Sequence, residues 1–240
     1  MSISLVSGSA QTLQTGTNTL SEIGGGSTWA ISFWVSLPAA GSLSSDNRAV
    51  YLTRFTTGPS RGYFIWFYNQ ASWGGRRFSF EGYNGSGGGL NDWTSSALDA
   101  AFNSGFHHFL VARINSTQLS LYMDGVLITT ITGTANSIDF PAASMQLEYG
   151  PASYGSTRAP TGDMANVKMF KDPGMPFADM AKIIYESQGN DNLTDGLVTE
   201  HKMDAGVTGS VMTAERDLST APNNIVTVNN SPTYLAAPLN

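Results

Sequence analysis

Aromatic and amide side chains recur near the expected loops of this chain, where they could bind sugars. A sugar ring stacks its apolar face on Tyr or Trp, and its hydroxyl groups bond to amide, carboxylate and backbone groups. On this chemistry we predict the ligand-binding candidates Trp73, Tyr83, Asn84, Trp93, Tyr149 and Tyr154. The alternative for each is that it caps a sheet edge or lies in a subunit interface, while Trp29, Trp34 and Trp66 belong to the core.

The three histidines do not predict a metal site or a catalytic triad. His107 and His108 are adjacent, so in a strand they point to opposite faces and cannot chelate one ion together. His108 falls on the apolar face of its strand, which favours a structural role, and we expect His201 to face outward. The chain has no cysteine, which excludes disulfides, thiolate catalysis and Cys-based zinc sites.

Composition limits the classes of partner. The 240 residues suit one large β-sandwich, and 41% hydrophobic residues are enough for a core. The net charge of −6 argues against nucleic acid and anionic membranes as partners. No apolar run is long enough to insert across a membrane, and no signal peptide is visible at the N-terminus.

A meander between residues 106 and 131 organises the chain. Alternation puts five residues of its first strand on one apolar face: Phe106, His108, Leu110, Ala112 and Ile114. Residues 115–117 form a polar break, and Asp124-Gly125 is a two-residue hairpin turn. The pattern predicts three strands with one apolar face that must pack on another layer.

Further strands are expected on either side of the meander. The pattern predicts them at residues 29–36, 50–55, 62–70, 77–81, 145–149, 163–170, 197–204 and 225–228, with a short edge strand at 2–6. The 62–70 strand is densely aromatic without clean alternation, which indicates either burial on both faces or a face that binds something. The glycine-rich stretch 83–91 is interpreted as a surface loop.

One helix is predicted, at about residues 176–187. Pro176 is suited to a first helical position, because the N–H that it lacks would have no partner there. Phe177, Met180 and Ile184 form an apolar stripe at helical spacing, and Gly189 is a plausible stop. We expect this stripe to pack under the sheet.

Two motifs resemble those of a known fold. The run Phe106 to Leu127 is similar to the "WHHVA … LYVDG" meander of concanavalin A-like, laminin G-like and pentraxin-like jelly rolls. Residues 162–170 resemble the "GDI-x-x-V-x-M-W" strand of pentraxin-like domains, and the helix follows at the expected place. The resemblance covers roughly residues 28 to 187. It implies an all-β, concanavalin A-like jelly-roll sandwich of two antiparallel sheets with one short helix. We expect a single domain over residues 1–240, with 196–235 supplying its closing strands.

The resemblance also sets expectations for catalysis and for metal. Glycoside hydrolases of this fold use two acidic residues in an E-x-D-x-x-E pattern, and no segment fits it, so we expect no enzyme. No cofactor is required, but many relatives bind calcium at the loop rim. The nearest equivalents are Glu148, with Asp46 and Asn47 from an early loop, although the adjacent acidic and amide group of the relatives is missing.

These expectations favour recognition over catalysis. The first hypothesis is a phage virion-surface protein, either a capsid decoration or a fibre or knob, whose partner is a cell-surface glycan. It would be a homo-oligomer or would assemble with other virion proteins. The second is an extracellular carbohydrate-binding module of a secreted enzyme or adhesin. The third is a glycan hydrolase or lyase whose turnover would depend on Glu200 or Glu148.

Overall fold

The fold is described from a computed structural model of the chain. It describes residues 2–5, 12–15, 28–36, 48–55, 61–70, 75–84, 90–94, 98, 105–115, 117–132, 146–149, 162–201, 216–217, 225–229 and 233–235. Side chains are described at 28–36, 65, 78, 80, 98, 105–115, 117–132 and 163–201, and only the backbone elsewhere.

Within these ranges the chain forms strands and one helix. In order they are β1 (Ser2–Leu5), β2 (Thr12–Thr15), β3 (Trp29–Ser36), β4 (Arg48–Phe55), β5 (Arg61–Gln70), β6 (Gly75–Asn84), β7 (Leu90–Thr94), β8 (Phe106–Asn115), β9 (Gln118–Met123), β10 (Val126–Thr132), β11 (Gln146–Tyr149), β12 (Gly162–Lys171), α1 (Phe177–Glu186), β13 (Leu197–His201), β14 (Arg216–Asp217), β15 (Ile225–Asn229) and β16 (Thr233–Leu235).

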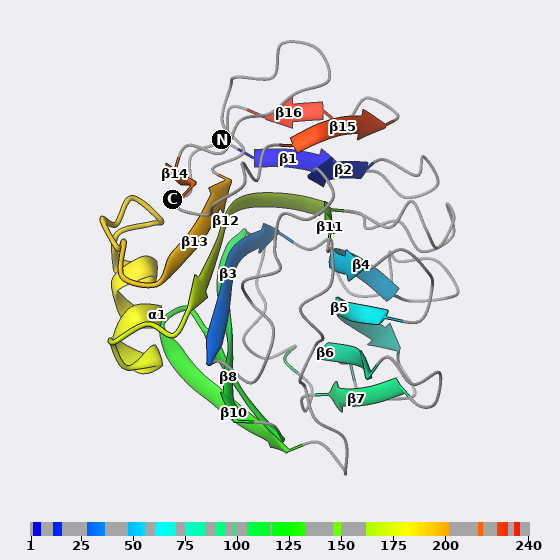
Figure 1. The fold of residues 1–240 in the computed structure, drawn as a ribbon. Helices are drawn as coiled ribbons and strands as arrows, with labels where there is room; N and C mark the ends of the chain where they lie inside the picture. Colours follow the sequence, from blue (N-terminus) through cyan, green and yellow to red (C-terminus); the bar gives the residue numbers. More distant parts are fainter. Residues whose placement is uncertain are drawn as a thin grey trace.

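The strands build two antiparallel sheets that face each other (Figure 1). The nine-stranded sheet has the order β10-β9-β8-β3-β12-β1-β16, with β13 and β14 continuing from the side of β12. The seven-stranded sheet has the order β15-β2-β11-β4-β5-β6-β7. The expected all-β sandwich of two antiparallel sheets with one helix is confirmed. The late strands β15 and β16 pair with β2 and β1, while the division of the chain into domains stays a prediction.

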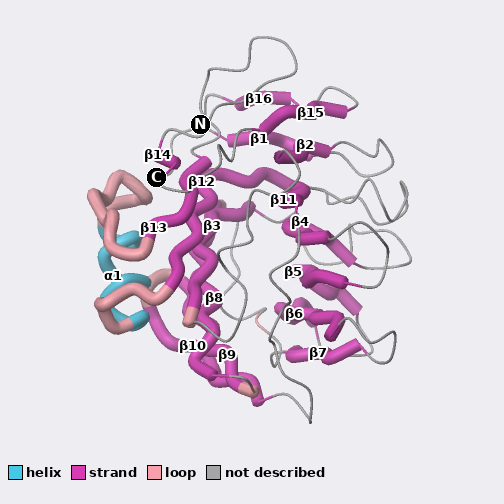
Figure 2. The backbone as a smooth tube through the Cα atoms, in the orientation of Figure 1, coloured by secondary structure: helices cyan, strands magenta, loops and turns pink. Residues whose placement is uncertain are grey.

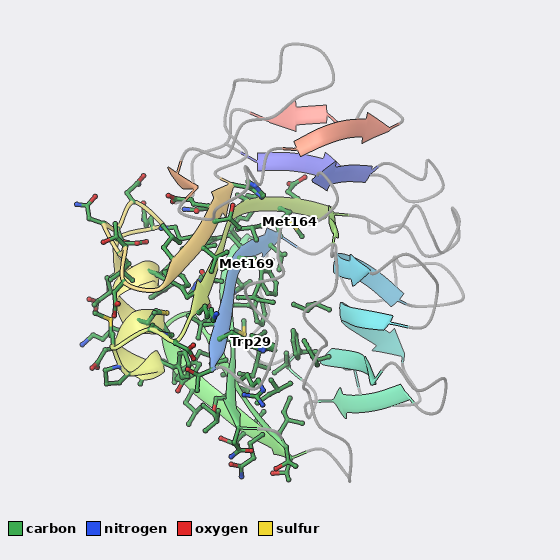
Figure 3. The ribbon with its side chains drawn as sticks, in the orientation of Figure 1. Trp29, Met164 and Met169 are labelled. Carbon is green, nitrogen blue, oxygen red and sulfur yellow. The ribbon has the colours of Figure 1, made fainter. Side chains whose placement is uncertain are left out.

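The core between the sheets is aromatic. Phe33 of β3 stacks on Phe109 of β8, with ring centroids 5.8 Å apart. Trp29, Met164 and Met169, labelled in Figure 3, are almost completely buried in the same sheet. Along β3 and β8 these side chains alternate with residues of the opposite face. In β12 the register shifts between Ala165 and Lys168, which puts Met164 and Met169 on the same face although they are an odd number of residues apart.

The predicted meander is confirmed, but its expected single apolar face is not. Strands β8, β9 and β10 follow the predicted breaks at residues 115–117 and at Asp124-Gly125. Seven consecutive residues of β8, from His107 to Arg113, are buried. The sheet is covered on both sides, because α1 packs on the face that points away from the second sheet (Figure 2).

Helix α1 matches the sequence prediction closely. Pro176 precedes its first residue, and Met180, Ala181 and Ile184 are its buried residues. They pack on a cluster from the nine-stranded sheet: Ala30, Leu110, Ala112, Tyr122, Phe170 and Leu197. Gly189 has a positive φ of 76° and donates its N–H to the Ile184 carbonyl, which ends the helix as predicted. No helix in the described ranges is long and apolar enough to span a membrane.

Several sequence expectations need correction. The strand β1 is not an edge strand, because it pairs with β12 on one side and β16 on the other. Strands β2, β7 and β16 lie in stretches where no strand was expected. The glycine-rich stretch 83–91 is not one loop, because residues 83–84 end β6 and residues 90–91 begin β7. Strands in glycine-rich and polar segments cannot be predicted from composition. Backbone hydrogen bonds hold these segments in the sheet, and their side chains show no strand pattern.

Candidate functional site

The seven-stranded sheet has an inner face that is fixed by three buried side chains. Ile65, Phe78 and Phe80 are fully buried. The ring of Phe80 lies 5.7 Å from that of Trp29, and the ring of Phe78 lies 6.5 Å from that of Phe109. Because Trp29 and Phe109 belong to the nine-stranded sheet, this face points into the sandwich.

Alternation then assigns the other face of β5. Strands β5 and β6 pair without a register shift from Arg61↔Asn84 to Gln70↔Gly75, with Ile65 opposite Phe80. Positions Phe64, Trp66 and Tyr68 therefore belong to the face opposite the core. We call these three positions the aromatic track. The aromatic residues of β5 therefore fall on two faces of the strand. One face carries Ile65 and points into the sandwich, and the other carries the aromatic track and points outward.

The register separates the sequence-predicted candidates into three groups. Tyr83 pairs with Gly62 on the outer face, and Glu148 shares that face because it pairs with Thr53, which pairs with Phe64. Positions on the inner face are Asn84, Trp93 and Tyr149, which pair with Arg61, Phe80 and Leu52 respectively. The candidates Trp73, Tyr154, Asp46 and Asn47 lie outside the described residues. The structure therefore brings Tyr83 and Glu148 onto one face with the aromatic track, and the list as a whole remains a prediction.

The sequence pattern assigns Trp66 to the core. Alternation shows only that Trp66 and its neighbour Ile65 face opposite ways, and it does not show which of the two points between the sheets. The pairing Val50↔Trp66↔Ser79 supports the outward assignment, because Ser79 alternates with the buried Phe78 and Phe80.

The nine-stranded sheet carries a buried charge cluster under the loop that follows α1. The Nζ atom of Lys168 lies 2.5 Å from Asp191 Oδ2 and 3.2 Å from Glu200 Oε1. The Gly189 carbonyl accepts two hydrogen bonds, one from Lys168 Nζ and one from Asn166 Nδ2. Lys168 and Glu200 face each other across the β12–β13 pair, and neither side chain is exposed. This cluster fastens the loop after α1 to the sheet.

Two residues of this region lie in surroundings that the sequence does not indicate. Glu200, one of the two residues named in the hydrolase hypothesis, is buried and has Lys168 as its cation. His201 was expected to face outward but is only 1% exposed, because β13 is covered on both sides. Strand β13 carries five buried residues in a row, which single-sequence alternation cannot reveal.

The two adjacent histidines have separate structural roles. His107 Nδ1 lies 2.7 Å from Asp124 Oδ2, and the other oxygen of Asp124 accepts the backbone N–H of His108. The Asp-Gly turn between β9 and β10 is thus tied to the start of β8. His108 Nε2 lies 2.9 Å from Ser32 Oγ, and its ring centroid lies 5.2 Å from that of Trp34. The predicted structural role of His108 fits this geometry.

Burial controls the protonation of His108. Desolvation lowers the pKa of this imidazole to about 3, and the nearby Lys168 acts in the same direction, while Asp124 opposes it. His108 is therefore neutral at physiological pH. A neutral imidazole held by Ser32 under a helix is a packing element and has no access to a substrate.

The described residues contain no group of three or more His, Asp or Glu side chains arranged to hold a metal ion. The backbone places Glu148 in the seven-stranded sheet, and its two expected partners for calcium lie outside the described ranges. Calcium binding thus stays a prediction.

The comparisons with known proteins agree with this architecture. A family model described as the concanavalin A-like lectin/glucanases superfamily matches residues 7–173, so the chain belongs to that superfamily. The match ends before α1, so the helix, Asp191 and Glu200 lie beyond it. Among curated proteins, none matches the chain in sequence.

Solved structures share the fold at low identity. A Bacteroides ovatus protein described as carbohydrate binding has a TM-score of 0.62 at 11% identity, and covers 100% of this chain and 61% of its own length. A structure described as that of an HCR/D mutant has a TM-score of 0.51 at 9% identity. The match covers 78% of this chain and 46% of that one. The mouse laminin alpha1 chain, domains LG4-5, has a TM-score of 0.47 at 14% identity, and covers 71% and 42%. This chain thus spans less than two thirds of each, and the first two likenesses show the fold alone.

Proposed function

We propose that this chain is a non-enzymatic, lectin-like recognition domain that binds a glycan on the outer face of the seven-stranded sheet. The observation that carries the proposal is the aromatic track, which occupies alternate positions of β5 on the face opposite Ile65 and Phe80. Alternate positions of a strand lie roughly 6.6–6.8 Å apart, so the track offers successive stacking surfaces to an extended oligosaccharide.

The arrangement of the two sheets supports this choice of face. The helix and its flanking loops pack on the nine-stranded sheet and cover its outer side. The ionisable and polar groups described there, such as Lys168 and His108, are buried and hold the cover in place. On the seven-stranded sheet, polar positions lie beside the track, because Glu81 pairs with Phe64 and Ser79 with Trp66. Aromatic surface bordered by polar groups is typical of sugar sites.

A glycan array tests the proposal. Wild-type protein should bind a defined glycan class, and Trp66→Ala should reduce the signal about tenfold or more, because the stacking surface is lost. Leu127→Ala is the matched control, since Leu127 is 50% exposed on β10 of the other sheet. Binding that is lost on chelation would bring Glu148 and calcium into the site. The absence of any glycan signal, with and without calcium, would overturn the proposal.

For the setting of this domain we propose the surface of a phage virion, where the chain decorates the capsid or forms a fibre or knob and assembles with itself or with other virion proteins. A carbohydrate-binding module of a secreted enzyme or adhesin accounts equally well for the fold and for the aromatic track. Mass spectrometry of purified virions separates the two settings. Abundance in virions supports the first, and detection only within a longer secreted polypeptide, or only in uninfected cells, contradicts it.

A further inference from the structure

Two arginines flank one end of the aromatic track. Tyr68 pairs with Arg48 of β4 on one side and with Arg77 of β6 on the other. Directly opposed residues share a face, so the three positions form one row across the outer face of the seven-stranded sheet. Neighbouring strands lie about 4.8 Å apart, which places the two arginine backbones roughly 10 Å from each other.

The other end of the track has the opposite charge. Phe64 pairs with Glu81, and Glu81 pairs with Asp92 of β7. The row between the two ends is neutral, with Val50, Trp66 and Ser79. The face therefore has a cationic end at Tyr68 and an anionic end at Phe64, joined by aromatic positions.

Two of the chain's few basic residues lie on this one row. The chain has 12 Lys and Arg among 240 residues and a net charge of −6. The guanidinium group binds carboxylates through two parallel hydrogen bonds, so an arginine position on each side of Tyr68 suits a carboxylate bound over this row. The arrangement is complementary to a ring that carries a carboxylate and stacks on an aromatic side chain.

We infer that the bound glycan contains a carboxylated sugar, such as a sialic or uronic acid, and that this residue lies over Tyr68 between Arg48 and Arg77. The inference rests on the proposed function and adds the chemical class of the ligand and its direction. The acidic sugar occupies the Tyr68 end of the track, and neutral sugars extend along Trp66 toward Phe64, where Glu81 and Asp92 repel a second acid.

Matched glycan pairs test this inference. The probes are sialylated glycans with their desialylated counterparts, and uronate-containing glycans with neutral ones, in low and high salt. Wild-type protein should prefer the acidic member about tenfold or more, because a hydrogen-bonded charge pair is worth that factor. The preference should fall as salt increases, since screening weakens the contact.

Variants locate the effect. Arg77→Ala and Arg48→Ala should each weaken binding of the acidic member far more than binding of the neutral member, and so remove most of the preference. Arg77→Lys should keep part of it, because the charge remains but the paired hydrogen bonds are lost. The control is Lys182→Ala, which removes one positive charge from an exposed position on α1, 65% accessible in its side chain. Circular dichroism and thermal unfolding of each variant verify that the fold is kept.

The outcomes separate this inference from the proposed function. Equal binding of acidic and neutral members by the wild type overturns the carboxylate inference and leaves glycan recognition standing. A preference that survives in both arginine variants, or that Lys182→Ala also removes, overturns the placement at Tyr68. Binding of sulfated glycans without carboxylated ones overturns the class of acid. Binding of no glycan at all overturns the inference together with the function on which it rests.

Discussion

The two sheets of this sandwich use polar and aromatic residues in opposite ways. In the nine-stranded sheet, Lys168, Glu200 and His108 are fully buried beneath α1 and its following loop. In the seven-stranded sheet, buried side chains fix the inner face, and the aromatic track takes the alternate positions. The residue types that most suggest chemistry therefore stabilise one sheet, while the aromatic track lies on the outer face of the other sheet, where we propose that recognition takes place.

This difference shows why side-chain type is a poor guide to function without burial. Lys168, Asp191 and Glu200 form a close group of ionisable residues, which in isolation resembles an active site. Because they are buried under a packed helix, we interpret them as a structural cluster that holds the loop after α1 on the nine-stranded sheet. We therefore expect changes in the covered sheet to reduce stability and to leave glycan binding intact in the folded fraction. Changes on the outer face of the other sheet should reduce glycan binding and leave stability intact.

The largest effect is expected for Lys168→Met. The change keeps the side-chain volume but leaves Asp191 and Glu200 buried without their shared cation, which typically costs about 3–5 kcal/mol of the free energy of unfolding. Chemical denaturation monitored by circular dichroism measures it. The control Lys182→Met breaks the exposed Lys182–Glu186 contact of 3.8 Å and should cost less than about 0.5 kcal/mol. Equal losses in the two variants would contradict the fastening role of the cluster.

Gly189→Ala is expected to lose up to about 3 kcal/mol. Gly189 has a φ of 76°, and an added Cβ would overlap the Nδ2 atom of Asn166, which donates to the carbonyl of the same glycine. The helix end and the loop that carries Asp191 would both shift. Asn166→Ala in the same background tests the cause, because removing the overlapping atom should recover part of the loss. If Asn166→Ala recovers none of the lost stability, the loss comes from the strained backbone conformation at position 189 alone and not from the overlap with Asn166.

Acid should weaken the covered sheet through His108. Because burial lowers its pKa from 6.5 to about 3, the unfolded chain binds more protons than the folded one between these values. Stability is therefore fully present above pH 6.5 and is lost as the pH falls toward 3. Between pH 7 and pH 5 the loss attributable to this group is about 2 kcal/mol.

The histidine contribution can be separated from the carboxylates. His108→Gln keeps a partner for Ser32 and removes the titrating group, so its stability should fall less steeply over the same pH range. Titration of the imidazole by nuclear magnetic resonance gives the pKa of His108 directly in the wild-type protein. A wild-type His108 that titrates near 6.5 would refute this mechanism.

Sequence reasoning recovered much of the fold because local patterns specify it. The Asp124-Gly125 turn, the helix between Pro176 and Gly189 and the strand at 162–171 follow from turn chemistry, capping and alternation. Strands such as β2 and β16 were missed, because four or three residues carry too little pattern. Burial on both faces of β8 and β13 depends on α1, which packs from a distant part of the chain.

The candidate site was harder to predict for a related reason. Whether Trp66 belongs to the core or to the outer face depends on which of two alternating sets points inward, and only pairing with the buried Phe78 and Phe80 decides it. The row Arg48–Tyr68–Arg77 joins three strands whose register is not readable from one sequence. Tyr83 and Glu148 are both named from the sequence; Tyr83 is expected in a loop but ends β6, whereas Glu148 lies in the strand predicted at 145–149.

The smallest effect on stability, and the most direct test of the central claim, is expected for Trp66→Ala. An outward side chain contributes little to the core, so the free energy of unfolding should change by less than about 0.5 kcal/mol. Glycan-array binding of this variant beside the wild type and Leu127→Ala is the measurement. The account predicts a loss of about tenfold or more for Trp66→Ala alone, with an unchanged unfolding midpoint. Retained binding in Trp66→Ala, or a large loss of stability that places Trp66 in the core, would contradict it.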